Sequence, residues 1–263
     1  MDTLNKLARR SPCLTHLTHL THLTYLTHLT LLTSLCLPWP AQGADKTANV
    51  PPGYKLVYEQ TFPRESALQD FVMTDPAAWR FARTNGVTAL DLFQQSHYQP
   101  PVRSPVNIAL ITDKVFADFV LEADLLQTSQ EYGHRDMCLF FGFQSPTNFY
   151  YVHLATAADD HAHNIFIVNG VPRTKIATKT TQGIDWGRGI WHKVRLERKV
   201  ADGSIKVYFD DLARPIMLAQ DKSFGAGAVG FGSFDDTGMV KNIHLWAPGM
   251  EVKKTEFFKA PGR

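Results

Sequence analysis

Short stretches in which apolar and polar residues alternate follow one another through most of the chain after residue 54. In FVLEADLLQ, at 119–127, every second side chain from Phe119 to Leu125 is apolar, as on one face of a β-strand. Turn-forming residues separate such stretches, and only 64–72 and 74–79 have a helical pattern. Strands are expected at 56–62, 79–84, 87–93, 106–112, 119–127, 136–144, 148–156, 163–170, 191–199, 204–211, 227–234 and 239–246. The pattern predicts an all-β protein, a two-sheet antiparallel sandwich or a barrel with few short helices, in one domain over 54–248.

The same alternation predicts which side chains of 136–144 and 148–156 face the core. The expected core set is Met137, Leu139, Phe141, Phe143, Tyr150, Val152 and Leu154. A tight hairpin over Ser145-Pro146 would pair Gln144 with Thr147. The other side chains of the two strands, including Cys138, would then share the opposite face.

That opposite face is expected to be polar and open. In the hairpin register Cys138 lies opposite His153, so Asp136, Tyr151 and His153 come within side-chain reach of one another. On the strand 119–127, Glu122 and Asp124 also belong to the side that faces away from the core. Carboxylates, an imidazole and aromatic rings on one face are typical of a sugar-binding groove.

Several segments resemble the concanavalin A-like jelly-roll superfamily. They are DFVLEADL, the FFGF strand, NFYYVHL, WHKVRLERKVADGSIKVYFDD and GAVGFGSFDDTGMVKNIHLW, within residues 54–247. Their order is most similar to laminin-G-like domains and to the 3-keto-disaccharide hydrolase domain of secreted bacterial proteins. The resemblance implies two antiparallel sheets with a ligand in a concave groove, in a fold that carries lectins, glycosidases, polysaccharide lyases and adhesion modules.

Two departures from the family pattern bear on the chemistry. Glycosidases of this superfamily often have the spacing E-x-D-x-E on one strand, whereas this chain has Glu122, Asp124 and then Leu126. Where the 3-keto-disaccharide hydrolase domain commonly has an Asn-Ser-Gly stretch, this chain has GHRDMC, residues 133–138. Glu122 and Asp124 match two of the three carboxylate positions, and the two departures put a transfer of the family's catalytic roles to this chain in doubt.

The candidate catalytic residues are those of the polar face together with GHRD. Histidine as a residue type suits proton transfer near neutral pH, so His153 and His134 are candidates, with Asp136 and Tyr151 as partners. The alternative for each histidine is a hydrogen-bonded structural residue.

Five further side chains are candidates for substrate binding. Glu122 and Asp124 would hydrogen-bond a sugar, Arg135 or Asn164 would neutralise a uronate, and Trp186, in a Gly-rich loop, would stack on a pyranose ring. For the two carboxylates, the alternative is an ordinary solvated strand face.

The segment ADDHAHN, at 158–164, is the candidate metal site. His161 and His163 are two residues apart and would point to one side of an extended segment, as zinc ligands do. Asp159 and Asp160 could instead hold calcium through oxygen. A solvated turn is the alternative, and no cofactor is required by the rest of the sequence. The pair Asp235-Asp236 is expected in a turn between strands.

The first 44 residues have the features of a signal peptide. A basic start with Lys6, Arg9 and Arg10 precedes an uncharged, apolar-biased stretch, and small residues after Pro40 suit cleavage. An uncleaved anchor is the rival reading. We expect residues 45–53 to be a linker, 249–263 a C-terminal tail, and the protein to be secreted or periplasmic, with no membrane span once the leader is removed.

Loss of the leader also changes the charge balance. The full chain has 27 basic and 25 acidic residues, and residues 45–263 have 24 of each. A neutral protein has no basic field for nucleic acid. Cys138 is the single cysteine outside the leader, so no internal disulfide is expected. The sequence therefore predicts an exported protein that recognises oligo- or polysaccharides, as a hydrolase or lyase or, alternatively, as a non-catalytic glycan-binding or adhesion module.

Overall fold

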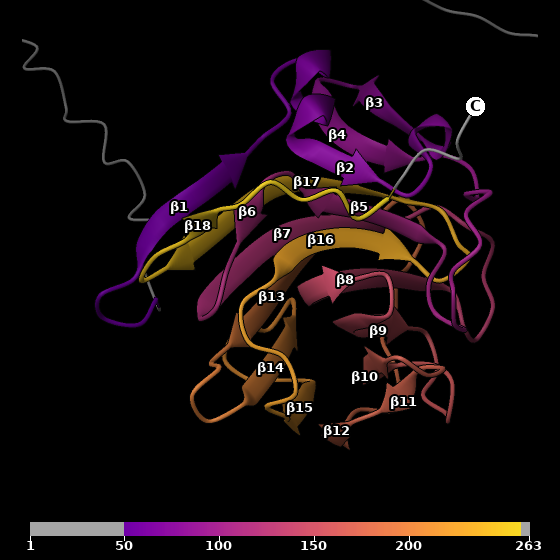
Figure 1. Ribbon diagram of the computed structural model, residues 1–263. Helices are drawn as coiled ribbons and strands as arrows, with labels where there is room; N and C mark the ends of the chain where they lie inside the picture. Colours follow the sequence, from indigo (N-terminus) through magenta and orange to yellow (C-terminus); the bar gives the residue numbers. More distant parts are fainter. Residues whose placement is uncertain (1–49, 259–263) are drawn as a thin grey trace, which may run out of the picture. The chain divides into compact units, whose positions relative to one another are not determined.

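A computed structural model of the protein describes residues 50–258. The predicted leader, most of the predicted linker and the end of the predicted tail lie outside the described residues. The described chain forms a nine-stranded and a seven-stranded antiparallel sheet that pack face to face (Figure 1). The predicted all-β, two-sheet sandwich is therefore confirmed.

The nine-stranded sheet has the order β12-β15-β14-β13-β7-β17-β4-β3, with β1 paired to β17. Its strands are β1 Lys55–Gln60, β3 Trp79–Thr84, β4 Val87–Leu92, β7 Phe119–Gln127, β12 Ala177–Thr180, β13 His192–Arg198, β14 Ser204–Phe209, β15 Met217–Gln220 and β17 Gly238–Ala247.

The seven-stranded sheet has the order β11-β10-β9-β8-β16-β5-β2. Its strands are β2 Phe71–Met73, β5 Asn107–Ile111, β8 Asp136–Ser145, β9 Asn148–Ala155, β10 Asn164–Asn169, β11 Thr174–Lys175 and β16 Ala228–Ser233. A two-stranded sheet joins β6, Lys114–Val115, to β18, Glu251–Val252. The two short 3₁₀ helices, η1 Glu65–Asp70 and η2 Pro76–Ala78, lie where helical pattern was expected.

The main hydrophobic core lies between the two large sheets and follows the alternation of the sequence. In β7, Phe119, Leu121, Ala123 and Leu125 are buried in this core. Met137, Leu139 and Phe141 of β8 and the predicted core residues of β9 meet them from the other sheet. The pairing of Cys138 with His153 is also as predicted.

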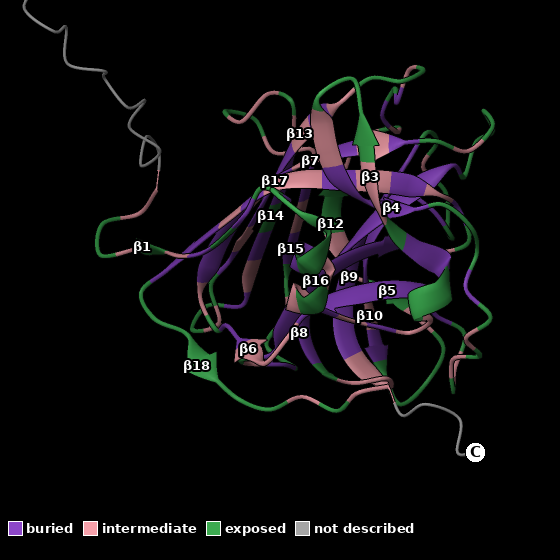
Figure 2. Cartoon of the chain, turned by 90° about the horizontal axis from the view of Figure 1, so that it is seen from above, coloured by how far each residue is buried: buried purple, intermediate pink, exposed green. Residues whose placement is uncertain are grey.

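The outer face of the seven-stranded sheet is not the open surface that we expected. A second apolar cluster covers much of it, and Phe140, Phe149 and Tyr151 are fully buried there. Val102, from the loop before β5, and Phe257-Phe258, from the C-terminal segment, pack on this cluster. Accordingly, β5 and most of β8 are buried along their length, and β5 is purple in Figure 2.

A bulge in β8 explains a second departure from the prediction. Gly142 has a φ of 54°, a left-handed conformation that suits glycine, and the register shifts between Phe141 and Ser145. Phe143 therefore joins the outer cluster and not the main core. Ser145 pairs with Asn148, so the expected pairing of Gln144 with Thr147 is wrong.

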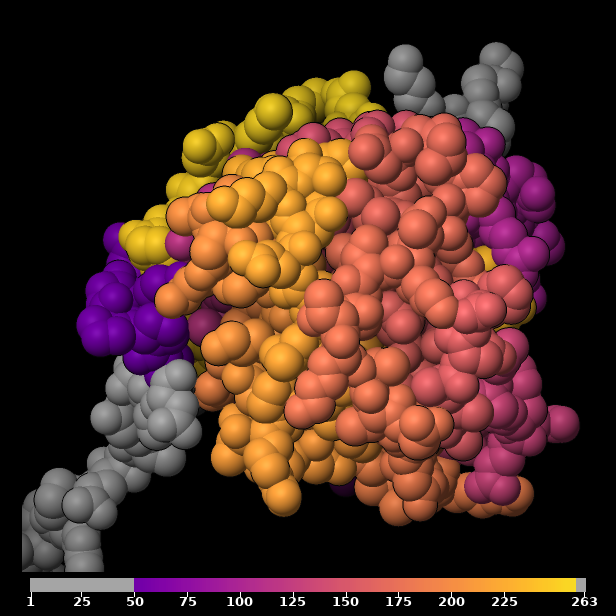
Figure 3. All heavy atoms as spheres, turned by 90° about the horizontal axis from the view of Figure 1, so that it is seen from below, coloured from indigo at the N-terminus to yellow at the C-terminus, as the bar shows by residue number. Residues whose placement is uncertain are grey.

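The two sheets meet at the edge formed by β10 and β12. Ile176 donates its backbone N–H to the carbonyl of Ile165 at 2.8 Å, and Thr180 Oγ1 donates to the carbonyl of His163 at 2.9 Å. Figure 3 shows the segments around residues 150–180 and 200–225 packed side by side on this side of the molecule. Among the described residues, no helix is long and apolar enough to cross a membrane.

Candidate functional site

A small cavity of about 140 Å³ opens beside the start of β8, on the outer face of the seven-stranded sheet. We call it the acid–histidine pocket. It is lined by Arg103, Tyr132, His134, His153, His161, Arg173, Phe234 and Asp235. Two of the predicted catalytic residues, His153 and His134, line this pocket. Asp136 lies next to His153, below the pocket surface.

Asp136 is fully buried and is surrounded by hydrogen-bond donors. Its Oδ2 accepts from the backbone N–H of Phe234 at 2.9 Å and from the Cys138 thiol at 3.1 Å. His153 Nε2 lies 3.3 Å from the same oxygen. A buried carboxylate requires such partners, since an unpaired charge in the interior is costly. Asp136 and His153 are therefore close together on one side of the sheet, as predicted.

The tautomer of His153 follows from its second nitrogen. The backbone N–H of His163 donates to His153 Nδ1 at 3.3 Å, so Nδ1 carries no proton. The proton of the neutral ring is then on Nε2, which faces Asp136. Both ring nitrogens thus face protein groups, and the side chain is only 3% exposed. In this arrangement His153 has no nitrogen available to exchange a proton with a ligand.

His134 and His161 stand at the rim of the pocket. Asp159 joins them, because its Oδ2 lies 2.5 Å from His134 Nε2 and its Oδ1 accepts from the backbone N–H of His161 at 2.6 Å. Burial opposes the ionisation of Asp159, but hydrogen bonds from the His161 backbone and from His134 outweigh it and lower the pKa of its carboxyl. Asp159 is therefore the anion that orients His134.

Three carboxylates meet at the side of the pocket formed by the turn after β16. Oxygen atoms of Asp136, Asp235 and Asp236 lie within 4.8 Å of one another. Asp236 Oδ2 accepts from the Tyr132 hydroxyl and from the backbone N–H of Asp136, both at 2.8 Å. Burial and then the charge of Asp136 raise the pKa of Asp236 to about 6, and the same two causes raise the pKa of the exposed Asp235. The carboxyl groups of this turn therefore take up protons at higher pH than ordinary aspartates do.

Arg173 forms the opposite wall. Its guanidinium lies 4.2 Å from the centre of the Phe234 ring and 4.8 Å from that of Phe166, and Nη1 donates to the Tyr151 hydroxyl at 2.8 Å. Tyr151, a predicted catalytic residue, is fully buried, and burial raises the pKa of its hydroxyl well above the ordinary value. Tyr151 thus positions Arg173 and does not reach the cavity.

The predicted metal ligands are not brought together. His163 has a φ of 49° and is fully buried, whereas His161 lines the pocket, so the two do not point to one side. His163 accepts from the Ala155 N–H and its Nε2 faces Thr181 Oγ1 at 2.9 Å. Burial lowers the pKa of His163 to about 4. Asp160 is exposed and pairs with Lys175.

Two other groups of residues have the spacing of metal ligands. In the group of Asp136, Cys138 and His153, the thiol donates to the carboxylate, and His153 Nε2 lies 3.3 Å from the same oxygen. Burial, and then the charge of Asp136, raise the pKa of the Cys138 thiol. The carboxylates of Asp136, Asp235 and Asp236 supply three of the six to eight oxygens typical of calcium sites.

Trp186 and Arg135 lie away from the pocket. Trp186 is 1% exposed and its Nε1 donates to the carbonyl of Arg135 at 3.2 Å, so the expectation of an exposed stacking ring is wrong. Arg135 is also buried and donates to Gln127 Oε1 at 2.8 Å. Asn164 is buried too, and its Oδ1 accepts from the Ala177 N–H at 3.1 Å. These three side chains serve the fold.

Glu122 and Asp124 lie on the outer face of the nine-stranded sheet, on the far side of the sandwich from the pocket. Glu122 pairs with Arg195, and Asp124 lies 2.9 Å from Lys193 Nζ. They share no groove with His153, so the expectation of a single polar face is wrong for these two carboxylates. Their charged partners come from the neighbouring strand β13.

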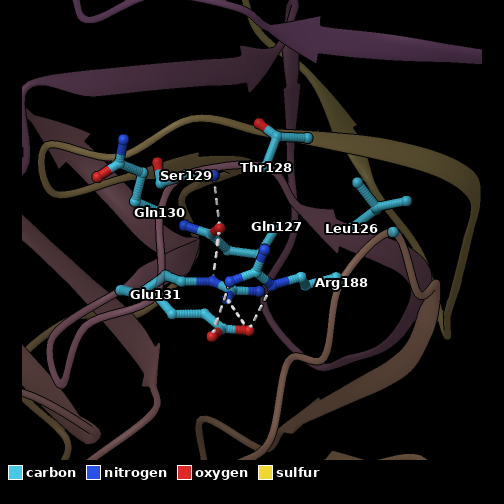
Figure 4. Close-up of a pocket in the computed structure, with 9 residues that line it drawn as sticks. Leu126, Gln127, Thr128, Ser129, Gln130, Glu131 and Arg188 are labelled. Atoms are coloured by element: carbon cyan, nitrogen blue, oxygen red, sulfur yellow. Dashed lines mark hydrogen bonds and ion pairs between the residues drawn. The ribbon is translucent and has the colours of Figure 1, made fainter.

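A larger, shallow hollow of about 730 Å³ lies on the other side of the loop 128–135. It is lined by Leu126, Gln127, Thr128, Ser129, Gln130, Glu131, Arg135, Arg188 and Gly189. Figure 4 shows the Glu131 carboxylate turned toward Arg188, whose Nε donates to it at 3.0 Å. Its charged groups are paired within the chain.

Reasoning from the sequence missed several residues of the pocket. Arg103, Arg173 and Phe234 come from loops and strand ends far apart in the chain, and no periodic pattern marks them. Asp235 and Asp236 were expected as turn residues, with calcium binding at that turn as the alternative. The dense polar composition of GHRD and SFDDTG was the available signal.

No family model and no curated protein matches the chain. Among solved structures, a Bacillus subtilis protein of unknown function with a galectin-like fold is similar at a TM-score of 0.50 and 14% identity, over 73% of this chain and 97% of that chain. Carbohydrate binding module CBM66 from Bacillus subtilis has a TM-score of 0.47 and 19% identity, over 67% and 94% of the chains. The acidic lectin of winged bean, complexed with methyl-α-D-galactose, is similar at a TM-score of 0.49 and 13% identity, over 76% of this chain and 100% of that chain.

The chain therefore has a galectin-like fold, which defines it as a two-sheet β-sandwich protein. A fold of this kind does not by itself set the function.

Proposed function

We propose that the protein binds carbohydrate through the acid–histidine pocket. The observation that carries the proposal is the mixture of groups on one small cavity: guanidinium donors, a carboxylate acceptor, imidazoles and the rings of Tyr132 and Phe234. Sugars present hydroxyls that both donate and accept, together with apolar C–H faces that contact aromatic rings. At about 140 Å³ the pocket is smaller than the cavities of about 300–1,000 Å³ that enclose drug-sized ligands, so one sugar unit is the expected occupant.

Binding without catalysis is favoured by the state of His153 and Asp136. A general base must lie within hydrogen-bond reach of the proton that it removes. Both nitrogens of His153 face protein groups, and Asp136 is fully buried beneath it. In this proposal the pair has a structural role and holds the side chains around the pocket in position.

The test is a titration of the protein with a panel of mono- and oligosaccharides, followed by calorimetry and repeated after EDTA treatment. Asp235→Ala should weaken the binding of any sugar that binds by about 10-fold, as expected for loss of one hydrogen bond to a charged group. Asp211→Ala, which removes an exposed carboxylate paired with Arg214 elsewhere, is the matched control and should leave binding unchanged. Absence of binding by the unaltered protein across the panel would refute the proposal. Loss of binding only with EDTA would show that a cation at the carboxylates takes part.

A second candidate function, a saccharide hydrolase or lyase, has one observation in its favour. His134 is oriented by Asp159, and its Nδ1 has no hydrogen-bond partner among residues 50–258. Asp235, whose pKa is raised, lines the same cavity and would supply the acid. Release of reducing ends or of an unsaturated product from polysaccharides, abolished in His134→Ala and retained in His97→Ala, would support catalysis.

We also propose that the protein is exported and that residues 1–44 are removed. The basic start and the uncharged stretch of the leader support this. Expression of the full chain in a bacterium, followed by N-terminal sequencing of the periplasmic or secreted form, tests it. A protein retained in the cytoplasm with its original N-terminus would contradict export.

A further inference from the structure

Arg173 is held in a fixed position and yet has no acidic partner. Its guanidinium is flanked by the Phe166 and Phe234 rings, and Nη1 donates to the Tyr151 hydroxyl. Its remaining N–H groups have no hydrogen-bond or ion-pair partner among the described residues. A planar fork immobilised in this way loses little freedom when it binds a ligand.

A second unpaired guanidinium lies beside the first. Arg103 is exposed, lies 6.0 Å from the Phe234 ring and lines the same cavity. The backbone N–H of Arg173 donates to the carbonyl of Arg103 at 3.1 Å, which fixes the two segments to each other. Some exposed arginines elsewhere have a carboxylate partner, Glu131 for Arg188 and Asp211 for Arg214, whereas within residues 50–258 Arg64 and Arg83 form no ion pair.

The acidic residues of the pocket form no ion pair with these two arginines, although Asp235 lines the same cavity and the charge of Arg173 acts to lower the pKa of its carboxyl. Within the described part of the chain, no carboxylate lies within the 4.0 Å ion-pair distance of Arg103 or Arg173. The carboxylates of Asp136 and Asp236 face inward and accept from Phe234, Tyr132 and the Asp136 backbone. A site for one anionic group is thus left between the two guanidinium groups.

We propose that the acid–histidine pocket binds a sugar that bears a carboxylate, such as a uronic acid unit, with the carboxylate on Arg173 and Arg103. The inference rests on the proposed carbohydrate binding and adds the class of sugar. A carboxylate matches the planar fork of a guanidinium with two parallel hydrogen bonds. The hydroxyls of the same sugar ring face Asp235, His134 and His161.

The first experiment compares each acid with its own neutral form. Glucuronic acid, galacturonic acid and a short oligogalacturonate are titrated by calorimetry beside their methyl esters and beside glucose and galactose. We expect at least one free acid to bind about 10- to 100-fold more tightly than its ester, and more weakly as salt rises. Equal binding of acids, esters and neutral sugars would overturn this inference and leave carbohydrate binding intact. No binding of any of them would count against both.

The second experiment tests whether the two arginines cause the tighter binding of the free acid relative to its methyl ester. Arg103→Gln and Arg173→Gln should each weaken binding of the free acid about 10- to 100-fold and hardly change binding of the ester. Arg173→Lys keeps the charge but loses the fork, and should give a smaller loss. Arg214→Gln is the matched control for an exposed arginine.

Melting temperatures check that each variant is folded. Arg103 is exposed, so Arg103→Gln is informative even if the replacement of Arg173 disturbs the packing of Phe166 and Phe234. An unchanged ratio of acid to ester affinity in Arg103→Gln and in the Arg173 variants would refute the assignment.

Discussion

The buried groups around the pocket predict two opposite dependences of stability on pH. His163, behind His153, has a pKa lowered from 6.5 to about 4, chiefly by burial and then by His153. Asp236 has a pKa raised from 3.8 to about 6, chiefly by burial and then by Asp136. Replacing one of the two residues should reveal a pH dependence of stability that is cancelled by the other residue in the unaltered protein.

The change of stability with pH has opposite signs for the two residues. The unfolded chain binds a proton at His163 near pH 6.5 and the folded protein only near pH 4, so the stabilisation is complete above pH 6.5 and is lost as pH falls toward 4. For Asp236 the folded protein binds the proton more tightly. Its ionisation therefore costs stability as pH rises from 3.8 to about 6, and acidification through that window stabilises the fold.

The two residues change the free energy of unfolding by similar amounts and in opposite directions, so their contributions largely cancel. One pKa unit corresponds to about 1.36 kcal/mol, which gives about 3 kcal/mol for His163. The same conversion gives about 3 kcal/mol at most for Asp236, and solvent near the rim of the pocket reduces it to about 2 kcal/mol. Between about pH 6 and pH 4 the free energy of unfolding of the unaltered protein should therefore change little on account of this pair.

The variants are His163→Asn and Asp236→Asn. Asparagine tolerates the positive φ of residue 163, and at residue 236 its carbonyl can still accept from Tyr132 and from the Asp136 backbone. Urea unfolding is followed by tryptophan fluorescence from about pH 7 to about pH 4.5, and each variant is compared with the unaltered protein at every pH. Subtraction removes the effect of the surface carboxylates that all three proteins share.

With falling pH, His163→Asn should gain stability relative to the unaltered protein, and Asp236→Asn should lose it. Any hydrogen bond lost by substitution adds only a constant offset. A flat difference curve for His163→Asn would refute the claim that this histidine is buried and neutral. Curves of the same sign for both variants would refute the opposition of the two groups.

Three further predictions concern the fold. Trp186→Ala should lower the free energy of unfolding by about 3–5 kcal/mol in urea, because a fully buried ring leaves a cavity; a loss below about 1 kcal/mol would contradict its burial. Gly232→Ala should abolish or greatly reduce soluble folded protein, measured by circular dichroism, because a Cβ would lie 1.8 Å from the Asn107 carbonyl oxygen. Cys138, buried and donating to Asp136, should resist alkylation in the native state and react only in denaturant, as read by mass spectrometry of its peptide.

The alternation of the sequence was sufficient to predict the sheets, because the core between them obeys the two-residue period of a strand. Phe119, Leu121 and Ala123 are buried as expected, and all twelve expected strands form. The short strands β2, β6, β11, β12, β15 and β18 were not expected, since two to four residues carry too little pattern. The bulge at Gly142 was also not predicted, and one inserted residue turned Phe143 to the other face.

The sequence predicted only the part of the candidate site whose position is set by the pairing of two neighbouring strands in one hairpin. The hairpin register brought Asp136 and His153 together, and both lie at the pocket. Residues that approach through loops could not be placed, because a loop's path depends on contacts distant in sequence. Arg103 and Arg173 are 70 positions apart and meet through one backbone hydrogen bond.

The period of a strand tells which face a side chain joins, but whether that face is open depends on what covers it. Phe140, Phe149 and Tyr151 point away from the main core as expected, yet the loop with Val102 and the C-terminal Phe257-Phe258 bury them. The covering stops short of His153, where polar side chains replace apolar ones and the cavity opens. The same alternation thus produces a second core along most of the face and a ligand pocket at its polar end. An open groove along the whole face would expose a large apolar surface, which single-domain proteins rarely do.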